Sequence, residues 1–454
     1  MLIQEEDSIV AKATPSGKGG IGVIRISGHK VLDIALSVFG LKPKERYVHY
    51  ASFRNNEGVI LDQGLVLFFR GPHSFTGEDV LEFHGHGGVV LMNMLITHLL
   101  TFDNIRLAKP GEFSERAFLN DKIDLTQAEA IADLIDASSE YAVKGALSSL
   151  QGEFAKKVNN IVDEVTYLRV YVEAAIDFPE EEIDFFADRT VIEKLDNIKQ
   201  LLHTILQQSE QSLAIKEGVN LALAGKPNAG KSSLLNAFVG SDKAIVTDVA
   251  GTTRDIISEQ IFLDGLPVNI IDTAGIREST DKVERIGIEK ALDAVKKADI
   301  VLLVIDVTDW CDYQIPEWIT ALSDKVKVFV VQNKIDLATD LKGLNNEMLN
   351  QFDVFSLSVK NKVGIEELKL AIQSFIGYNP NNESLFIARK RHIEALKNAL
   401  EHLLLGIEQL MVHHAGELLA EELKCVQLYL SEITGAFSSD DLLGKIFSSF
   451  CIGK

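Results

Sequence analysis

Cysteine is scarce in this chain of 454 residues. The three cysteines, Cys311, Cys425 and Cys451, lie far apart and form no C-x-x-C pair. This spacing excludes a disulfide framework and a zinc site built on cysteine pairs, and it favours a reducing compartment. The acidic N-terminal residues lack the basic and apolar regions of a signal peptide, so we expect a cytoplasmic protein.

Positive charge and long apolar runs are also scarce. Lys and Arg number 45 against 66 Asp and Glu, which gives a formal net charge of −21. This balance argues against bulk electrostatic binding of nucleic acid, although it does not exclude a local basic groove. The longest apolar candidate, residues 89–100, contains His98 and is shorter than the ~18 residues that a membrane-spanning helix needs. We therefore expect no membrane partner.

One stretch, residues 225–232, fits the phosphate-binding pattern G-x-x-x-x-G-K-S/T. An apolar run suited to a buried parallel strand precedes it, and the opening of a helix follows it, which is the context that this motif needs. The loop N–H groups would surround phosphate oxygens, Lys231 would reach the β- and γ-phosphates, and Ser232 would hold Mg²⁺. A simple glycine turn is the alternative, and only further motifs can exclude it.

Three further motifs follow in order. An apolar strand ends in D-x-x-G at 272–275, and a second strand ends in N-K-x-D at 333–336. The Asp336 carboxylate can accept bonds from the N1–H and 2-amino groups of guanine. Adenine lacks both donors and would leave the carboxylate unpaired. Residues 358–360, with Val359 where GTPases usually carry alanine, stand where a base-contacting loop is expected. Together the motifs predict a guanine-nucleotide domain on an α/β sheet.

The rest of the chain divides by its periodicity. Residues 1–120 alternate short apolar runs with glycine turns, and 89–102 is typical of a helix packed on strands, which predicts an α+β module. The turns at 75–88 and 110–113 carry His and Glu, so they are either a ligand surface or tight turns with solvated charges. Helical spacing begins near residue 125 and resumes after 379–382, on both sides of the nucleotide-binding block. We expect one helical domain with the GTPase domain inserted into it.

These features together resemble the MnmE (TrmE) family of tRNA-modifying GTPases, over essentially the whole chain. The motifs that carry the resemblance are residues 13–15 with 19–22 and Arg25, 75–79 with 84–88, 110–120, 251–255 and the final C-x-G-K at 451–454. The resemblance implies an N-terminal tetrahydrofolate-binding and dimerisation domain (1–120), a helical domain in two parts (121–214 and 379–454), and a Ras-like P-loop GTPase domain (215–378).

The resemblance also implies an activity and partners. With the flavin-dependent MnmG protein, such an enzyme forms a heterotetramer built on a homodimer. The complex installs an aminomethyl or carboxymethylaminomethyl group at C5 of the wobble uridine of tRNA. The one-carbon donor would be 5-formyl- or methylene-tetrahydrofolate. The implied folate-binding residues are Arg25, Glu82, Lys122 and Lys454.

The GTPase site is assigned from the motifs and from the resemblance. The predicted GTP-binding residues are Asn228, Ala229, Gly230, Lys231, Ser232, Ser233, Thr247, Asp248, Val249, Ala250, Gly251, Thr252, Thr253, Asp272, Thr273, Ala274, Gly275, Asn333, Lys334, Asp336, Ser358, Val359 and Lys360. Ser232 and Thr253 would hold Mg²⁺. The resemblance implies a K⁺ ion in place of an arginine finger, held by Asn228, Thr247, Val249 and Thr252.

Four residues are candidates for catalysis. The resemblance implies that Glu284 positions the attacking water, because Ile276 stands where many GTPases carry glutamine. Arg254 and Arg277 are either arginine-finger candidates or exposed loop charges. Cys451 lies near Lys454, which would favour its thiolate, and it is a candidate nucleophile or acid–base group at the uridine ring. Residues 440–450 before it predict an amphipathic helix that docks by its large apolar side chains.

Two rival functions remain open from the sequence. Ribosome-assembly GTPases share the T-T-R-D, D-T-A-G and N-K-x-D motifs, although they usually carry a basic RNA-binding domain that we do not find in this chain. A folate-binding GTPase scaffold without a direct role in uridine chemistry would also fit, because no strong acid–base pair is visible. Mass analysis of tRNA nucleosides would distinguish the three functions.

Overall fold

The computed structural model describes residues 7–177, 189–239, 257–271, 295–322, 326–338, 351–376, 386–436, 440–448, 450 and 453. The predicted site residues 247–254, 272–275, Arg277, Glu284, Cys451 and Lys454 lie outside the described residues. The chain divides into two compact units, which are described separately below. The first unit contains residues 1–136, 146–204 and 394–454, and the second contains residues 137–145 and 205–393.

The N-terminal part of the first unit is a six-stranded sheet in the order β3-β4-β5-β2-β1-β6. Its strands are β1 (Ser8–Lys12), β2 (Gly22–Ser27), β3 (His49–Arg54), β4 (Ile60–Phe69), β5 (Val80–Gly85) and β6 (Ile105–Leu107). Neighbouring strands are antiparallel except β1 and β6. Helices α1 (Val31–Phe39) and α2 (Val89–Leu99) share one apolar core with the sheet. The predicted helix at 89–102 thus ends at Leu99, and its last residues continue as a looser turn.

Alternation along the strands decides which side chains remain outside that core. Ile24 and Phe83 point toward α1 and α2, so Arg25, Glu82 and His84 lie on the opposite face of the sheet. Helix α3 (Glu112–Leu119) packs on this opposite face, where Phe113 joins a small buried cluster with residues of β1. The polar face of the sheet therefore meets the start of α3.

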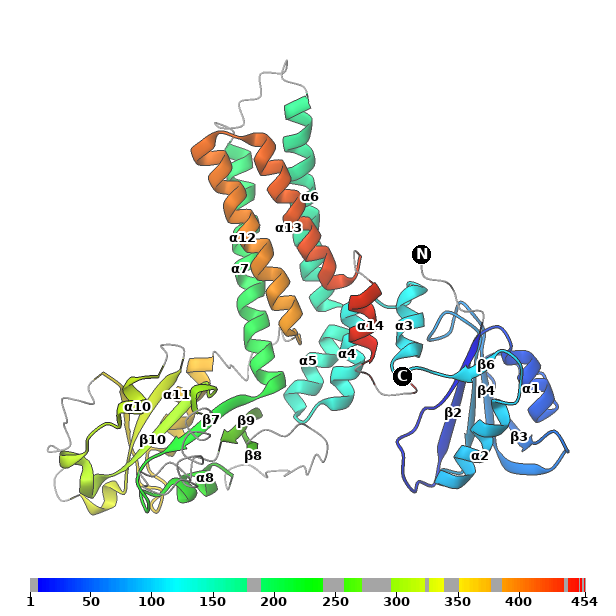
Figure 1. Ribbon diagram of the computed structural model, residues 1–454, viewed down its shortest axis with the longest axis horizontal. Helices are drawn as coiled ribbons and strands as arrows, with labels where there is room; N and C mark the ends of the chain where they lie inside the picture. The colour runs from blue at the N-terminus through cyan, green and yellow to red at the C-terminus, as the bar shows by residue number, and fades with distance from the viewer. Residues whose placement is uncertain are drawn as a thin grey trace, which may run out of the picture. The chain divides into compact units, whose positions relative to one another are not determined.

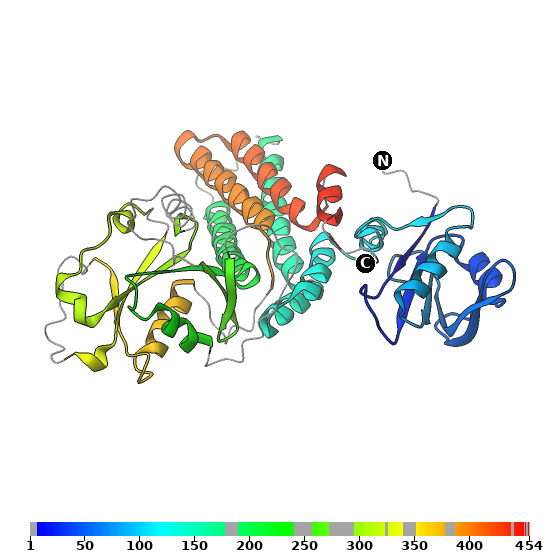
Figure 2. The ribbon, with the colours of Figure 1, turned by 60° about the horizontal axis from the view of Figure 1, so that its bottom comes forward.

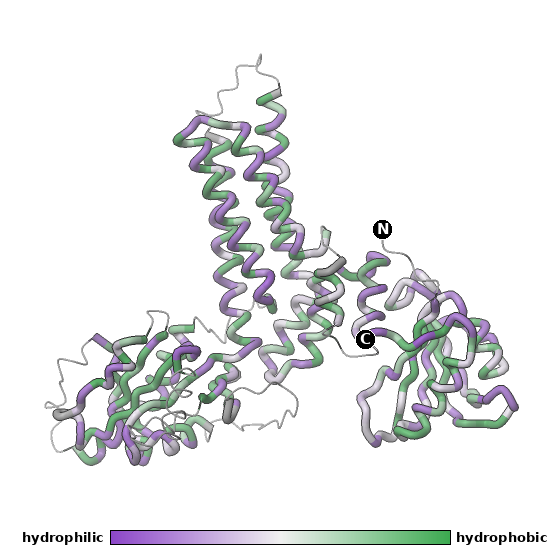
Figure 3. Tube along the Cα trace, viewed as in Figure 1, coloured by the Kyte–Doolittle hydropathy of each residue, from purple (hydrophilic) through white to green (hydrophobic). Residues whose placement is uncertain are grey.

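The helical part of the first unit is built from helices, three of which extend into the residues of the second unit. These helices are α4 (Leu125–Asp136), α5 (Glu140–Leu150), α6 (Glu153–Asp177), α7 (Arg189–Glu217), α12 (Lys390–His413), α13 (Gly416–Thr434) and α14 (Asp440–Ser448). Figure 1 and Figure 2 show α6, α7, α12 and α13 side by side as a bundle. Apolar and polar residues alternate along each helix (Figure 3), as expected when one face of each helix is buried. No helix among the described residues could cross a membrane.

The second unit contains a second six-stranded sheet, in the order β12-β11-β10-β7-β9-β8. The strands are β7 (Val219–Ala224), β8 (Ile257–Leu263), β9 (Leu266–Ile271), β10 (Ile300–Asp306), β11 (Lys327–Asn333) and β12 (Asp353–Ser356). All pairs are parallel except β8 with β9. Separate apolar clusters cover its two faces, which explains the nearly continuous apolar sequence of the inner strands.

Shorter elements of the second unit surround this sheet. They are α8 (Lys231–Val239), η2 (Val307–Asp312), α10 (Glu317–Thr320), η3 (Ile335–Leu337) and α11 (Ile365–Ile376). After β7 the chain adds β8 and β9 on one side and then β10 on the other. The order of strands thus reverses at the carboxyl end of β7, where α/β sheets bind ligands. The predicted fold class, with α+β, helical and P-loop α/β parts, is confirmed.

Candidate functional site

The loop after β7 is closely packed against the ends of neighbouring strands. Gly225 and Gly230 both have positive φ, and Asn228 between them adopts the left-handed conformation with φ 66°. A Cβ atom on Gly225 would overlap the Val304 carbonyl oxygen, and one on Gly230 would overlap the Asn333 amide. Only glycine fits at these two positions, so the glycines of the motif are required by packing as well as by conformation.

The lysine of this loop is held within the loop itself. Lys231 Nζ donates hydrogen bonds to the Gly225 carbonyl at 2.7 Å and to the Lys226 carbonyl at 2.9 Å. Lys231 opens α8, whose N-terminal N–H groups favour an anion. Ser232 and Asn228 are exposed beside it. The loop therefore presents an ammonium group, a helix N-terminus and two side-chain oxygens to one region, which suits a phosphate with its metal ion.

Asn333 joins the phosphate loop to the base-contacting loop. Its buried side-chain amide donates to the Ala229 carbonyl at 2.8 Å. Its side-chain oxygen accepts from the Lys334 N–H at 2.8 Å and the Val359 N–H at 3.4 Å. One side chain at the end of β11 thus fixes both loops, so the structure brings Ala229, Asn333 and Val359 together as the motifs require.

Asp336 is exposed, and a hydrogen bond from Ser358 orients its carboxylate. The Ser358 hydroxyl, which is buried, donates to Asp336 Oδ1 at 2.6 Å and accepts from the Asn361 N–H at 3.2 Å. Such a bond restricts the rotation of the carboxylate while its second oxygen stays accessible. The arrangement presents a fixed pair of acceptors, which matches the two N–H donors on one edge of guanine.

Lys334 completes this end of the sheet. It has a left-handed backbone with φ 66°, and its ammonium group bonds Asp306 Oδ2 at 2.6 Å. Burial raises the pKa of Asp306, but hydrogen bonds from Lys334 and Thr308 outweigh it, so the pKa lies below its ordinary value. The Asp306 carboxylate therefore stays charged, and its bond to the Lys334 ammonium group fixes the Lys334 side chain. Lys360 and Ser233 are placed at the same end of the sheet, on the neighbouring loop and helix.

A second polar cluster lies on the open face of the N-terminal sheet. Arg25 and Glu82 are cross-strand neighbours, and Arg25 Nε donates to Glu82 Oε1 at 2.8 Å. His84 Nε2 lies 3.0 Å from the other oxygen of Glu82. Burial alone would raise the pKa of Glu82. The hydrogen bond to His84 and the charge of Arg25 together lower this pKa by more, so it lies below its ordinary value. Glu82 is thus a fixed carboxylate anion.

Lys122 and the end of the chain approach the same domain. Gly77, in the loop between β4 and β5, has φ 79°, and a Cβ there would lie 3.4 Å from Lys122 Cδ. Gly453 is buried with φ 99°, and a Cβ there would overlap the Lys12 carbonyl oxygen. Lys12 ends β1, which pairs with β2, the strand that carries Arg25. The residue before Lys454 is therefore placed against the strand next to Arg25.

Helix α14 explains how the tail reaches that position. Ile446, Phe447 and Phe450 are buried with residues of α4, as the amphipathic pattern predicts. A Cβ on Gly111 would lie 2.6 Å from the Phe447 carbonyl oxygen, and Gly111 has φ 69°. The turn before α3 is therefore in direct contact with the C-terminal helix.

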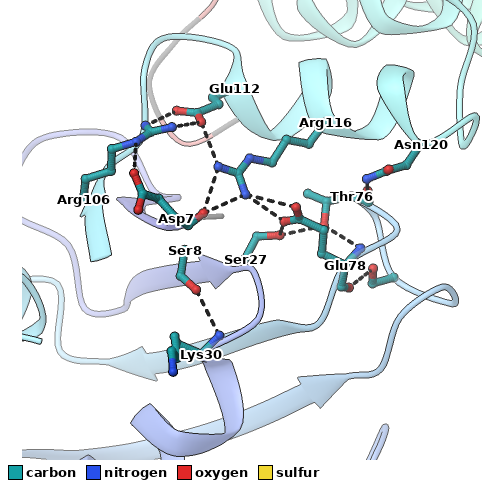
Figure 4. A network of polar contacts seen from close by, with 11 residues as sticks. Asp7, Ser8, Ser27, Lys30, Thr76, Glu78, Arg106, Glu112, Arg116 and Asn120 are labelled. Carbon is teal, nitrogen blue, oxygen red and sulfur yellow. Dashed lines mark hydrogen bonds and ion pairs between the residues drawn. The ribbon is translucent and has the colours of Figure 1, made fainter. Parts of the chain in front are cut away.

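The sequence did not reveal a buried charged network at the start of α3 (Figure 4). Arg116 has 8% of its surface exposed, and its guanidinium contacts Glu78 and Glu112 at 3.0 Å. Arg106 also binds Glu112, at 2.7 and 2.8 Å. Two phenylalanines beside Arg25, Phe75 and Phe113, were missed as well. Their positions inside the F-T-G-E-D and P-G-E-F motifs were the available signal.

Comparison with known proteins gives matches over most of the chain. Residues 8–122 match the family model described as GTP-binding protein TrmE N-terminus, and residues 125–451 match the one described as MnmE helical domain. The tRNA modification GTPase MnmE of Shewanella putrefaciens (strain CN-32) is 56% identical over 454 residues, 99% of each chain. The protein of the same name from Shewanella oneidensis is 55% identical over 455 residues, again 99% of each.

Solved structures give weaker matches. A point variant of Aquifex aeolicus Era bound to GDP·AlF4⁻ has a TM-score of 0.27 and 25% identity, covering 41% of this chain and 67% of that one. The G domain of the T. maritima FeoB iron transporter has a TM-score of 0.25 and 29% identity, covering 35% and 98%. A likeness of this degree decides nothing about fold or function.

Proposed function

This chain belongs to the MnmE family of tRNA modification GTPases, and from that premise we propose how its two sites work. It is a GTP hydrolase that acts in tRNA modification. We propose that it works in the cytoplasm with a flavin-dependent MnmG-type partner. In this proposal the pair installs an aminomethyl or carboxymethylaminomethyl group at C5 of the tRNA wobble uridine, and the carbon comes from 5-formyl- or methylene-tetrahydrofolate.

Guanine selection in this proposal rests on Asp336. Its carboxylate, oriented by Ser358, accepts the two N–H donors of the base, while Asn333 keeps the base-contacting loop beside the phosphate loop. Lys231 transfers its ammonium bonds from the loop carbonyls to the phosphates. Ser233, Lys334 and Lys360 complete the part of the GTP site that lies in described residues.

Metal ions fit the donor atoms that this loop exposes. Oxygen ligands from side chains and backbone suit Mg²⁺ and K⁺, and the exposed Ser232 hydroxyl and Asn228 amide are such donors. We assign Ser232, with Thr253, to Mg²⁺, and Asn228, with the Thr247, Val249 and Thr252 carbonyls, to K⁺. When bound, the cations supply positive charge for the transferring phosphate. Glu284 would position the attacking water, and Arg254 and Arg277 would lie in the switch loops.

The folate proposal is carried by one juxtaposition. Gly453 is packed on β1, and the Arg25–Glu82 pair lies on the next strands of the same sheet. We propose that the Glu82 carboxylate accepts the pterin N–H donors, and that Arg25, Lys122 and Lys454 provide positive charge for the folate carboxylates. Cys451, two residues before Gly453, would then stand beside the folate and act on the uridine ring.

The proposed assembly follows the family. We propose a homodimer formed through the domain at 1–120, which joins MnmG in a heterotetramer and takes tRNA as substrate. The helical domain at 121–214 and 379–454 would carry the GTPase domain at 215–378. Charge supports a protein partner for tRNA delivery, because a net charge of −21 gives this chain little bulk attraction for RNA.

Two measurements test the proposal. Calorimetric titration of the full chain with 5-formyltetrahydrofolate should show saturable binding, and Glu82→Gln should abolish it. Mass analysis of tRNA nucleosides from cells lacking the protein should show unmodified C5 at the wobble uridine. Normal wobble uridines together with a defect in ribosome assembly would overturn the proposal in favour of a ribosome-assembly GTPase. Normal folate binding together with normal wobble uridines would instead support a folate-binding GTPase scaffold with no direct role in uridine chemistry.

A further inference from the structure

Arg25 lies between two aromatic rings of different character. Its guanidinium carbon is 5.9 Å from the centre of the Phe75 ring and 5.7 Å from that of Phe113. Phe113 is fully buried, whereas Phe75 is 38% exposed. Phe113 is therefore a fixed wall of the domain. Phe75 is a partly exposed ring beside Arg25, which is paired with Glu82.

Phe75 joins none of the apolar clusters that the described residues of this domain form. It belongs to the loop between β4 and β5, and loops of this kind keep one conformation only if other bonds fix them. Several bonds fix the loop. The buried Thr76 has its hydroxyl 2.7 Å from that of Ser27, and its carbonyl accepts from the Asn120 amide at 2.7 Å. Glu78 adds a charged anchor, because its two carboxylate oxygens both lie 3.0 Å from Arg116 Nη1. The Ser27 hydroxyl adds a bond of 2.7 Å to the same carboxylate.

Arg116 connects this loop to the helix that carries the other ring. It lies in α3, three residues after Phe113, so the two side chains share one side of the helix. Its second nitrogen bonds Glu112 at 3.0 Å, and both nitrogens bond the Asp7 carbonyl at 3.1 Å (Figure 4). A planar guanidinium with several partners in fixed directions is a rigid connector. Through Glu78, Arg116 thus links the loop that carries Phe75 to the helix that carries Phe113.

We propose that Arg116 is a positioning residue for ligand binding, which acts by holding Glu78 and thereby keeping the Phe75 ring over the Arg25–Glu82 pair. The inference rests on the proposed folate site. A flat heterocycle that bonds Glu82 by its edge presents its face to Phe75, and aromatic rings bind such faces by stacking. The geometry makes Phe75 a specificity-determining residue for a flat ring, and Arg116 the group that places it.

The test is a double-mutant cycle on the full chain. Affinity for 5-formyltetrahydrofolate is measured by calorimetric titration for the wild type, Phe75→Leu, Arg116→Lys and the double variant. Lysine keeps the positive charge of Arg116 but loses the planar guanidinium that donates to several partners at once. We expect each single variant to bind on the order of tenfold more weakly, because stacking and charge-assisted bonds each contribute this much. The double variant should bind no more weakly than Phe75→Leu alone, because Arg116 acts through Phe75.

Arg106→Lys is the matched control. Arg106 bonds the same Glu112 at 2.7 and 2.8 Å, so this variant disturbs the cluster around Glu112 without changing Arg116, and folate affinity should stay within about twofold of the wild type. Glu78→Gln is the second test, because it breaks the link from the loop side and leaves Arg116 with Glu112 and Asp7. It should reproduce the loss seen in Arg116→Lys. GTP hydrolysis and thermal unfolding are followed in each variant.

Each possible outcome decides the inference. Independent, multiplying losses in the double variant would overturn it, since they would show that Arg116 does not act through Phe75. An equal loss in Arg106→Lys would also overturn it, because the effect would then come from α3 as a whole. If Arg116→Lys fails to fold, full affinity in Glu78→Gln overturns the inference and a weakened affinity supports it. A wild-type chain that binds no folate would reject the folate site itself, and the inference with it.

Discussion

Replacement of Ser358 by alanine tests how the chain selects guanine. The change removes the 2.6 Å hydrogen bond that orients Asp336. A hydrogen bond to a charged group contributes about 1.5–3 kcal/mol, and we expect the lower end because Asp336 is exposed. The affinity for GTP should therefore fall on the order of tenfold. The Asn361 N–H also loses its acceptor, so a small loss of stability is expected as well.

Nucleotide titration calorimetry measures the effect, and two further variants interpret it. Ser356→Ala is the control, because the Ser356 hydroxyl bonds Gln332 from the adjoining strand end and is not bonded to Asp336. Its GTP affinity should equal that of the wild type. Asp336→Asn should lose GTP and favour xanthosine triphosphate, because the amide presents a donor where guanine also has donors. Unchanged GTP affinity in both Ser358→Ala and Asp336→Asn would refute the assignment of Asp336.

Three other perturbations have definite expected results. Replacing Na⁺ by K⁺ at constant ionic strength should raise the rate of GTP hydrolysis on the order of 10³-fold, as an arginine finger does, and equal rates would exclude the K⁺ site at Asn228. Cys451→Ser should abolish wobble-uridine modification in cells and leave GTP hydrolysis intact; full restoration of modified tRNA by this variant would exclude a chemical role for the thiol. Burial raises the pKa of Glu112, but bonds from Arg106, the Lys109 N–H and Arg116 lower it below the ordinary 4.5. The stability that Glu112 contributes is thus complete above pH 4.5 and is lost as the pH falls through the lower folded value. Denaturant unfolding across this range should show that loss, and the non-titrating Glu112→Gln variant should lack it.

The sequence predicted those parts of the molecule that follow from local pattern. The strand–loop–helix at 219–239 was predictable because a continuous apolar strand and a glycine loop leave few alternatives. Pairing of Asp336 with Ser358 was predictable in outline, because both follow strands whose carboxyl ends meet at one edge of a parallel sheet. The two helical segments on either side of the inserted domain were predictable because neither could bury its apolar face alone.

What the sequence could not predict depends on buried polar residues with distant partners. Arg116 appears in the sequence as one more charge in a helix, but its partner Glu78 lies 38 positions away. Neither residue forms a recognisable pair until β2, α3 and the loop between β4 and β5 are assembled. The same holds for Phe75, which the sequence placed only in a turn and which the structure leaves 38% exposed beside Arg25.

Asn269 shows the physical reason most clearly. It lies in β9, where all six residues are buried, and a polar side chain there is costly unless every group is bonded. Its amide nitrogen donates to the Glu217 carbonyl at 3.0 Å, 52 positions away, and its oxygen accepts from Gln260 at 3.0 Å. The hydrophobicity pattern of the strand gives no reason for a polar residue at this position. In the folded chain it ties the end of α7 to β8 and β9, so its role can be recognised only in the tertiary structure.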